Sequence, residues 1–201
     1  MARHRTLEMI NPRRLERMRD VLRYRQQDLT LVCENIHDPH NVSAILRSCD
    51  AVGLEQVQLL YNEEVYPKLA EKSSASARKW IDTLTHKDPE SLAKRLKARG
   101  FRLYATHLGT AAVSIHEVDW TQPSAIILGN EHRGISPELL AQADANIKIP
   151  MFGMIQSLNV SVAAAVILYE ACRQRIAKGS YTQGSHDHEW IEERLLNWIK
   201  R

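Results

Sequence analysis

The stretch "IPMFGMIQSLNVSVAAAVILYE", residues 149–170, joins three kinds of sequence. It begins at the end of a strand-like run, "NIKIP", and continues through a loop of glycine, methionine and serine. It then enters the most apolar helical pattern of the chain, which we expect to cover about 159–178 and to end at Gly179. Because polar residues stand where this helix begins, the loop either caps a core helix or binds a ligand.

Strand-like and helical segments alternate on the amino-terminal side of this stretch. Short apolar runs predict strands in "DLTLVCENI", "EQVQLLY", "FRLYAT", "SAIILG" and "NIKIP". Periodic apolar residues with capping signals predict helices at about 11–25, 41–53, 88–100 and 136–143. The Ser/Ala/Lys-rich segment 68–79 is expected to be a loop or a marginal helix. The alternation predicts an α/β fold with a mostly parallel sheet flanked by helices.

The two ends of the chain are expected to be helical additions to one central domain. We predict a basic helical extension over 1–27, the domain over 28–178, and a linker with an amphipathic helix over 179–201. No apolar run is long enough for a membrane span, and the basic start of the chain lacks the apolar core of a signal peptide. Cys33, Cys49 and Cys172 stand in apolar surroundings and are expected to be reduced. These features predict a cytoplasmic protein without a membrane segment.

Arginine is concentrated at the amino terminus. Residues 1–26 contain eight arginines, no lysine and three acidic residues, which gives 8 − 3 = +5, whereas the whole chain carries +3. Guanidinium groups bind phosphates in a planar, bidentate geometry. The segment is therefore either a solvated helix face or, as we favour, a surface that contacts nucleic acid.

Polar and glycine residues collect where the predicted strands end, in "NIHDPHNVSAILR", "THLGT", "GNEHRG" and "MFGMIQSLN". Ligands of open parallel sheets bind outside the carboxyl ends of the strands. The sequence contains neither G-x-x-x-x-G-K-[ST] nor G-x-G-x-x-G, which argues against a ligand held by its phosphates but leaves open an adenosine-bearing one. The histidines have no metal-ligand spacing, and His186 and His188 are expected to be solvated in the linker, so we predict no metal.

Two charged residues of these segments allow a plain structural interpretation. Arg47 follows Ile45 and Leu46 on a helix, where it would extend its head into water from an apolar edge. Glu131 would make capping bonds at a helix start.

Taken together, these segments resemble one family. "NIHDPHNVSAILR", "ILGNEHRGIS" and "IPMFGMIQSLNVSVAAAVILYE" are similar, in order and spacing, to the three motifs of the SpoU or TrmH-type RNA ribose methyltransferases of the SPOUT superfamily. "THLGT" resembles the loop before the second motif. The resemblance covers about 28–178. It implies a deep trefoil knot at the carboxyl end of the domain, a homodimer, and S-adenosylmethionine (AdoMet) bound in the knot.

The resemblance also implies roles for single residues. Asn41 and Arg47 match the first motif, in which the arginine is the proposed activator of the ribose 2′-hydroxyl. Glu131, Ser157 and Asn159 match active-site positions of the second and third motifs. The positions expected to contact AdoMet are Thr106, Leu108, Gly109, Gly129, Asn130, Ile149, Met151 and Leu158.

The basic ends of the chain are similar to the tRNA-binding extensions of family members that methylate guanosine 18 of tRNA. The residues expected to contact RNA are Arg13, Arg14, Arg17, Arg19, Arg173 and Arg175. Methylation of ribosomal RNA or of a tRNA wobble nucleotide, and a catalytically silent RNA-binding protein, are the alternatives. The sequence leaves open which tRNAs are substrates and what the tail after Gly179 does.

Overall fold

The computed structural model describes residues 10–67, 79–109, 111–182 and 184–200. Most of segment 68–79, for which we expected a loop or marginal helix, lies outside these ranges, as do Arg3 and Arg5 of the basic amino terminus.

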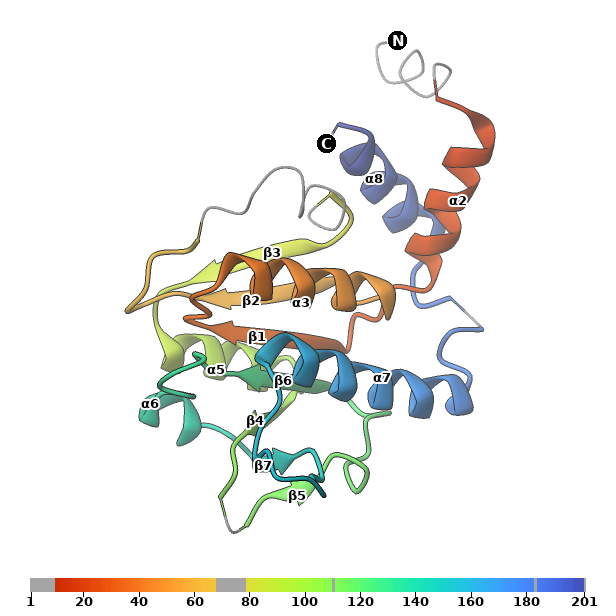
Figure 1. The fold of residues 1–201 in the computed structure, drawn as a ribbon. Helices are drawn as coiled ribbons and strands as arrows, with labels where there is room; N and C mark the ends of the chain where they lie inside the picture. The colour runs from red at the N-terminus through yellow and green to blue at the C-terminus, as the bar shows by residue number, and fades with distance from the viewer. Residues whose placement is uncertain (1–9, 68–78, 110, 183, 201) are drawn as a thin grey trace.

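Within this part of the chain, the strands form one seven-stranded sheet in the order β3-β2-β1-β6-β4-β7-β5 (Figure 1). Every strand pairing is parallel. The predicted parallel α/β fold is thus confirmed. The strands are β1 (Leu29–Glu34), β2 (Gln56–Leu60), β3 (Asp82–His86), β4 (Arg102–Thr106), β5 (Val113–Ser114), β6 (Ser124–Leu128) and β7 (Ala145–Lys148).

Helices cover both faces of the sheet. α3 (Pro39–Ala51) and α7 (Val160–Lys178) lie together on one face and close the larger apolar core (Figure 1). α5 (Pro89–Ala98) and α6 (Pro137–Leu140) close a second core on the other face. Asn159 caps α7 by accepting hydrogen bonds from the backbone N–H groups of Ser161 and Val162, and Gly179 ends this helix with φ +84°.

The two terminal helices pack against each other rather than separately on the domain. α2 (Pro12–Arg23) and α8 (His188–Ile199) lie side by side (Figure 1). Met18 and Leu22 of α2 share a small core with Ile191, Leu195 and Trp198 of α8. The chain ends therefore form one helical pair beside the sheet.

Two strands and the exposure of two valines were not predicted. β3 and β5 were missed, because "DTLTH" is an edge strand without apolar alternation and β5 has only two residues. The apolar pattern of α7 would place its valines in the core, but Val162 and Val166 are 47% and 37% exposed on the outer side of this helix. Among the described residues, no helix is long and apolar enough to cross a membrane.

Candidate active site

A cavity of about 460 Å³ opens at the carboxyl ends of β4, β6 and β7. Its walls come from three separate parts of the chain, the segments 106–108, 128–134 and 147–167. Both its position and its size are typical of small-molecule sites in parallel sheets. The predicted site residues that line it are Thr106, Leu108, Gly129, Asn130, Glu131, Ile149, Met151, Ser157, Leu158 and Asn159.

Three predicted residues do not line this cavity. Gly109 lies beside it, where its N–H donates to His107 Nδ1 at 3.1 Å. Asn41 is buried at the start of α3 and contacts two of the lining residues. Arg47 is exposed on α3, and its side chain makes no hydrogen bond or ion pair with any residue that the structure describes.

Asn41 connects the three motifs by direct hydrogen bonds. Its Nδ2 donates to Glu131 Oε1 at 2.9 Å, and its Oδ1 accepts from Asn159 Nδ2 at 3.0 Å. Asn159 Oδ1 in turn accepts from Ser161 at the start of α7. Both functional groups of the Asn41 amide are used, so its orientation is fixed by its neighbours.

Glu131 is held as a carboxylate. Burial disfavours its charged form, but hydrogen bonds from His37 N, Asn41 Nδ2 and Asp38 N outweigh burial and lower its pKa below the usual range. These donors bind both carboxylate oxygens, at 2.9 to 3.3 Å. At neutral pH Glu131 is therefore an acceptor that holds the first motif against the second, and not a proton donor. The capping interpretation of Glu131 is close to this geometry, because the bonded N–H groups precede α3.

The loop of the second motif depends on a glycine at its base. A Cβ atom at Gly129 would lie 2.2 Å from Gly134 C and 2.3 Å from Ile135 N. Asn130 then pairs with Gly134 through two backbone hydrogen bonds of 2.9 Å. The chain therefore turns back on itself directly beside the cavity, and only glycine fits at its base.

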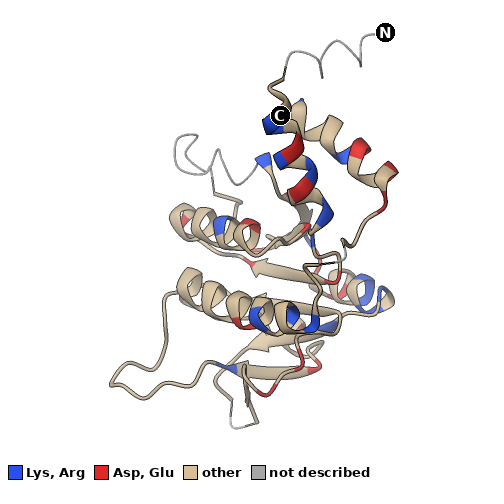
Figure 2. Cartoon of the chain, turned by 90° about the vertical axis from the view of Figure 1, so that its right-hand side faces the viewer, with Lys and Arg blue, Asp and Glu red and all other residues tan. Residues whose placement is uncertain are grey.

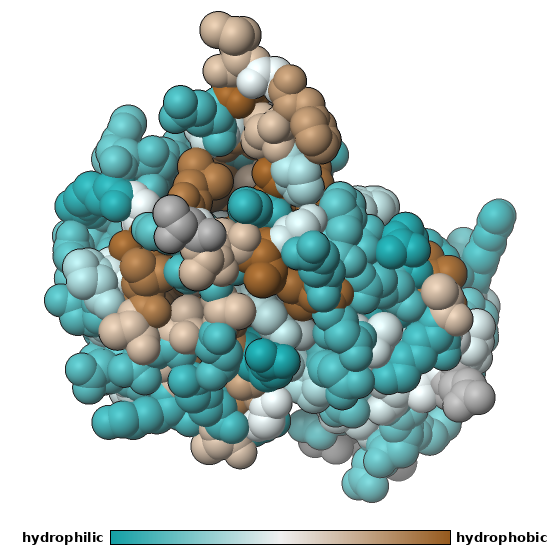
Figure 3. Space-filling view, turned by 90° about the horizontal axis from the view of Figure 1, so that it is seen from below, coloured by the Kyte–Doolittle hydropathy of each residue, from teal (hydrophilic) through white to brown (hydrophobic). Residues whose placement is uncertain are grey.

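The loop of the third motif is open to solvent. Phe152 and Met154 are 97% and 99% exposed, and Ile155 and Leu108 are also exposed. Figure 3 views the molecule from the side of β5 and β7 and shows apolar side chains at this surface. Exposed apolar groups on this scale mark a surface that binds something.

The predicted RNA-contacting arginines differ in their surroundings. Arg13, Arg14 and Arg17 are exposed on α2. Arg19 pairs with Glu192 of α8 at 2.6 Å, and the exposed Arg173 pairs with Glu170 at 2.8 Å. Figure 2 shows both charges on the pair of terminal helices.

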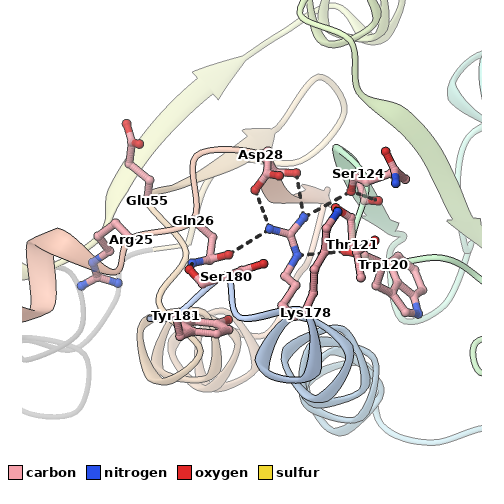
Figure 4. A network of polar contacts seen from close by, with 12 residues as sticks. Arg25, Gln26, Asp28, Glu55, Trp120, Thr121, Ser124, Lys178, Ser180 and Tyr181 are labelled. Atoms are coloured by element: carbon pink, nitrogen blue, oxygen red, sulfur yellow. Dashed lines mark hydrogen bonds and ion pairs between the residues drawn. The ribbon is translucent and has the colours of Figure 1, made fainter. Parts of the chain in front are cut away.

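Arg175 was predicted to contact RNA, and this prediction is wrong. Its side chain is 1% exposed, and its guanidinium donates to Gln26 Oε1, to the Asp28 carboxylate and to backbone carbonyl groups. Figure 4 labels Gln26, Asp28 and Trp120, three of the residues to which this guanidinium donates. Since every one of these acceptors belongs to the protein, Arg175 is a structural residue.

His186 was expected to be solvated, and this prediction is also wrong. Its side chain is 5% exposed. The ring stacks on Trp190 at 3.5 Å and lies 3.5 Å from Glu55 Oε2. The linker therefore docks on the domain before α8 begins.

Several residues of the site were not predicted. His107 and Lys148 line the cavity from the ends of β4 and β7. Asn35, which follows β1, has a positive φ and is hydrogen-bonded to Asn130. The usable signal for His107 and Lys148 was their place at strand ends. For Asn35 it was the tolerance of asparagine for left-handed backbone conformations.

The sequence matches the SpoU rRNA Methylase family over residues 28–169. The chain belongs to this family. It is 48% identical over 188 residues to the tRNA (guanosine(18)-2'-O)-methyltransferase of Thermus thermophilus, a match that covers 94% of this chain and 96% of that relative.

Solved structures of SpoU proteins agree with this assignment. The Aquifex aeolicus TrmH/SpoU tRNA modifying enzyme is 42% identical, with a TM-score of 0.88 over 94% of this chain and 95% of that one. The SpoU methyltransferase AviRb of Streptomyces viridochromogenes in complex with AdoMet is 29% identical. It superimposes with a TM-score of 0.67 over 76% of this chain and 62% of that one.

Proposed function

We propose that this SpoU family protein transfers a methyl group from AdoMet to the ribose 2′-hydroxyl of guanosine 18 in tRNA. The observation that carries the proposal is the meeting of the three motifs around one cavity, with Asn41 hydrogen-bonded to Glu131 and Asn159. The target is supported by the Thermus thermophilus relative, whose name specifies guanosine 18 and whose similarity covers 94% of this chain.

The cavity suits AdoMet in its chemistry. Apolar side chains such as Leu128, Ile149 and Leu158 offer contact area to an adenosine. Gly129 leaves room for the tight turn of the loop at residues 130–134, whose backbone borders the cavity. The residues that would hold AdoMet are those predicted from the family resemblance. Gly109 lies beside the cavity and would contribute by shaping the loop that follows β4.

Methyl transfer to a hydroxyl requires alignment and removal of the hydroxyl proton. When bound, AdoMet supplies the electrophilic methyl group. Asn41, Glu131 and Asn159 would hold the ends of α3 and α7 and the second-motif loop in one geometry around the reacting atoms. Ser157 and Asn159 stand at the mouth of the cavity, where they would face the ribose.

Arg47 is proposed to act on the 2′-hydroxyl. A guanidinium is protonated at neutral pH and is therefore a poor base. It either loses a proton with help from a nearby phosphate and then takes up the hydroxyl proton, or it stays charged and stabilises the developing alkoxide while the hydroxyl proton passes to solvent. We favour the second role. The absence of any partner among the described residues leaves all its donors free for an incoming ribose or phosphate.

The exposed arginines are proposed to bind the tRNA backbone. Arg13, Arg14 and Arg17 have no acidic partner within the described chain, whereas Arg19 and Arg173 must share their charge with Glu192 and Glu170. Binding through phosphates weakens steeply with salt. Filter binding of tRNA at rising salt tests this role, and affinity that does not change with salt would remove these arginines from the interface.

A homodimer with the carboxyl-terminal trefoil knot is the proposed assembly. The outer side of α7 exposes a stripe at spacings of four, three and seven residues, which suits packing against a second helix. The exposed Phe152 and Met154 continue the apolar surface into the third-motif loop. The stripe consists of Val162, Val166, Tyr169 and Ile176. Sedimentation equilibrium of the protein and of the variant Tyr169→Glu tests whether this face joins two copies.

The activity is tested with tritium-labelled AdoMet and tRNA transcripts that differ only at nucleotide 18. Transfer to the transcript with guanosine 18, and loss of transfer when this nucleotide is changed, are expected. Transfer that persists, with the label mapped to the wobble position or found in ribosomal RNA, would replace the proposed target. AdoMet binding by calorimetry without any transfer would indicate a silent RNA-binding protein. Since tRNA is the proposed substrate, the protein is expected in the cytoplasm.

A further inference from the structure

Asn35 has a left-handed backbone conformation, which residues other than glycine adopt only occasionally. It follows β1 directly, its φ is +51°, and it is the only non-glycine residue with a positive φ among those that the structure describes. Its side chain is buried, with 3% of the residue exposed. Strained conformations of this kind persist where the surroundings fix them, often at functional sites.

The carbonyl group of Asn35 reaches the second motif. It accepts a hydrogen bond of 2.7 Å from Asn130 Nδ2, and this contact is buried. The other end of the same amide, Asn130 Oδ1, accepts from the N–H groups of His132 and Arg133 at 2.9 and 3.1 Å. The side chain of Asn130 thus donates to a residue outside its loop, Asn35, and accepts from two N–H groups within its loop.

The side chain of Asn35 holds a different loop. Its Nδ2 donates to Asn62 Oδ1 at 2.8 Å, and its Oδ1 accepts from the N–H groups of Glu63 and Glu64. Glu63 and Glu64 in turn pair with Arg133 at 3.1 and 2.8 Å. The loop after β2 therefore contacts the second-motif loop in two ways, through the hydrogen bonds of Asn35 and through the ion pairs of Arg133 with Glu63 and Glu64.

Asn130 and Glu131, which form one wall of the cavity, are both hydrogen-bonded to the segment that follows β1. Asn35 O holds Asn130, and the N–H groups of His37 and Asp38 hold Glu131. The direction of the Asn35 carbonyl is set by its positive φ. A change in this φ would rotate the acceptor away from Asn130.

We propose that Asn35 is a positioning residue, whose left-handed backbone aims its carbonyl at Asn130 and so fixes the Asn130–Glu131 wall of the AdoMet cavity. The proposal rests on the proposed function, because it assumes that this cavity binds AdoMet. The backbone conformation carries the effect on the cavity, and the side chain carries the attachment of the 62–64 loop.

Two substitutions separate these roles. Asn35→Gly removes the side chain but accepts a positive φ without strain, so the carbonyl remains directed at Asn130. Asn35→Ala removes the same contacts and also disfavours the left-handed conformation. We expect Asn35→Ala to weaken AdoMet binding by about tenfold and Asn35→Gly to stay within about twofold of the parent protein.

The matched control is Gly100→Ala. Gly100 follows α5, has φ +83°, and has no atom within 4 Å of an added Cβ. The alanine therefore brings the same kind of backbone strain to a place away from the cavity. We expect it to lower the unfolding midpoint while the AdoMet affinity stays unchanged.

AdoMet affinity is measured by calorimetry on the full chain at a temperature where circular dichroism shows each variant folded. Wild-type affinity in Asn35→Ala, or equal losses in Asn35→Ala and Asn35→Gly, would overturn the proposal. If Asn35→Ala does not fold, Asn35→Gly decides alone, since a tenfold loss there would assign the effect to the side chain. A parent protein that binds no AdoMet would instead refute the proposed function.

Discussion

Polar side chains form dense networks at both edges of the sheet, but the two networks differ. At the carboxyl edge, Asn41, Glu131 and Asn159 bond to one another beside a cavity of about 460 Å³. At the amino edge, two buried arginines bind the carbonyl groups that precede the strands. Arg175 binds Asp28 and Gln122 before β1 and β6, and Arg25 binds Leu54 and Trp80 before β2 and β3.

The amino edge leaves little for a ligand to bind. The guanidinium of Arg175 makes all its contacts within the chain, and Arg25 also pairs with Asp50 and lies 5.4 Å from the Trp198 ring. The space beside Arg25 is only about 10 Å³, enough for about one water molecule. The size of the open space, about 460 Å³ at the carboxyl edge against about 10 Å³ at the amino edge, therefore distinguishes the proposed active site from a structural network, and the number of polar residues does not.

The largest effect is expected for Arg47, whose side chain has no partner among the described residues, in contrast to the buried arginines of the amino edge. Arg47→Ala should lower kcat by about a thousandfold, because the developing charge on the ribose oxygen loses its stabilising group. AdoMet affinity should change by less than about twofold, since Arg47 does not line the cavity. Initial rates of tritium transfer and calorimetry measure the two quantities.

Arg47→Lys is the control for charge alone. It is expected to remain strongly impaired, because an ammonium group cannot contact a hydroxyl and a phosphate in the fork geometry of a guanidinium. A variant with most of the parent rate, for either substitution, would show that Arg47 is a solvated surface residue like others on exposed helix faces.

The second prediction concerns Arg175, whose guanidinium is fully hydrogen-bonded within the protein. Arg175→Ala should lower the free energy of unfolding by about 3 kcal/mol, since it leaves buried carbonyl groups without a donor. AdoMet affinity of the folded fraction should be retained. Urea unfolding followed by circular dichroism provides the measurement.

Arg173→Ala is the matched control for Arg175→Ala, because Arg173 lies two residues away on the exposed side of α7. Loss of its ion pair with Glu170 should change the free energy of unfolding far less than Arg175→Ala does, because ion pairs of exposed side chains contribute little to stability. Equal stability losses in the two variants would mean that the amino edge does not depend on Arg175.

The third prediction tests how tightly the cavity wall is packed. Gly129→Ala places a Cβ within 2.2 to 2.4 Å of backbone atoms of Gly134 and Ile135. Such overpacking costs about 1–3 kcal/mol, so AdoMet affinity should fall by about tenfold or more. Gly153→Ala is the control, since an added Cβ there meets no atom within 4 Å. If Gly129→Ala bound AdoMet as well as Gly153→Ala does, the second-motif loop would not form the cavity wall in solution.

The sequence predicted the carboxyl edge better than the amino edge. Strand ends with polar and glycine residues indicate a binding edge because parallel strands bring these ends together. The burial of Arg175 could be predicted only in part from the sequence. Arg175 shares the helical spacing of the buried Ala164, Leu168 and Ala171, opposite the exposed Arg173. Its acceptors lie up to 149 residues away in the chain, and no local pattern reveals them.

The edge strand β3 shows another limit of sequence patterns. Its residues 83–86 are "TLTH", in which Leu84 is exposed and His86 is buried. His86 is accommodated because it is hydrogen-bonded to Gln58 of β2 and to Arg95 of α5. A buried histidine with two polar partners inverts the usual apolar signal of a strand, which explains why β3 was not predicted.

The smallest expected effect concerns the pH dependence of the amino edge. Burial is the main cause that lowers the pKa of His186, and it outweighs the carboxylates of Glu55 and Asp187, while Arg194 acts in the same direction as burial. A lowered pKa means that the folded protein prefers the neutral ring. The stability from His186 is therefore fully present above the unfolded-state pKa of about 6.5 and is lost as the pH falls through the lower folded-state value.

The test compares the thermal midpoints of the parent protein and His186→Phe between pH 8 and pH 5. Phenylalanine can keep the stacking on Trp190 but cannot be protonated, and the other histidines are common to both proteins. The parent midpoint should fall by about 2 °C more than that of the variant over this range. If the Glu55 carboxylate governed His186 instead, protonation would stabilise the parent protein and the difference would have the opposite sign. His186 and Glu55 would then form an ion pair only in acid. At neutral pH this part of the amino edge would lack that ion pair, whereas Arg175 keeps all its hydrogen bonds.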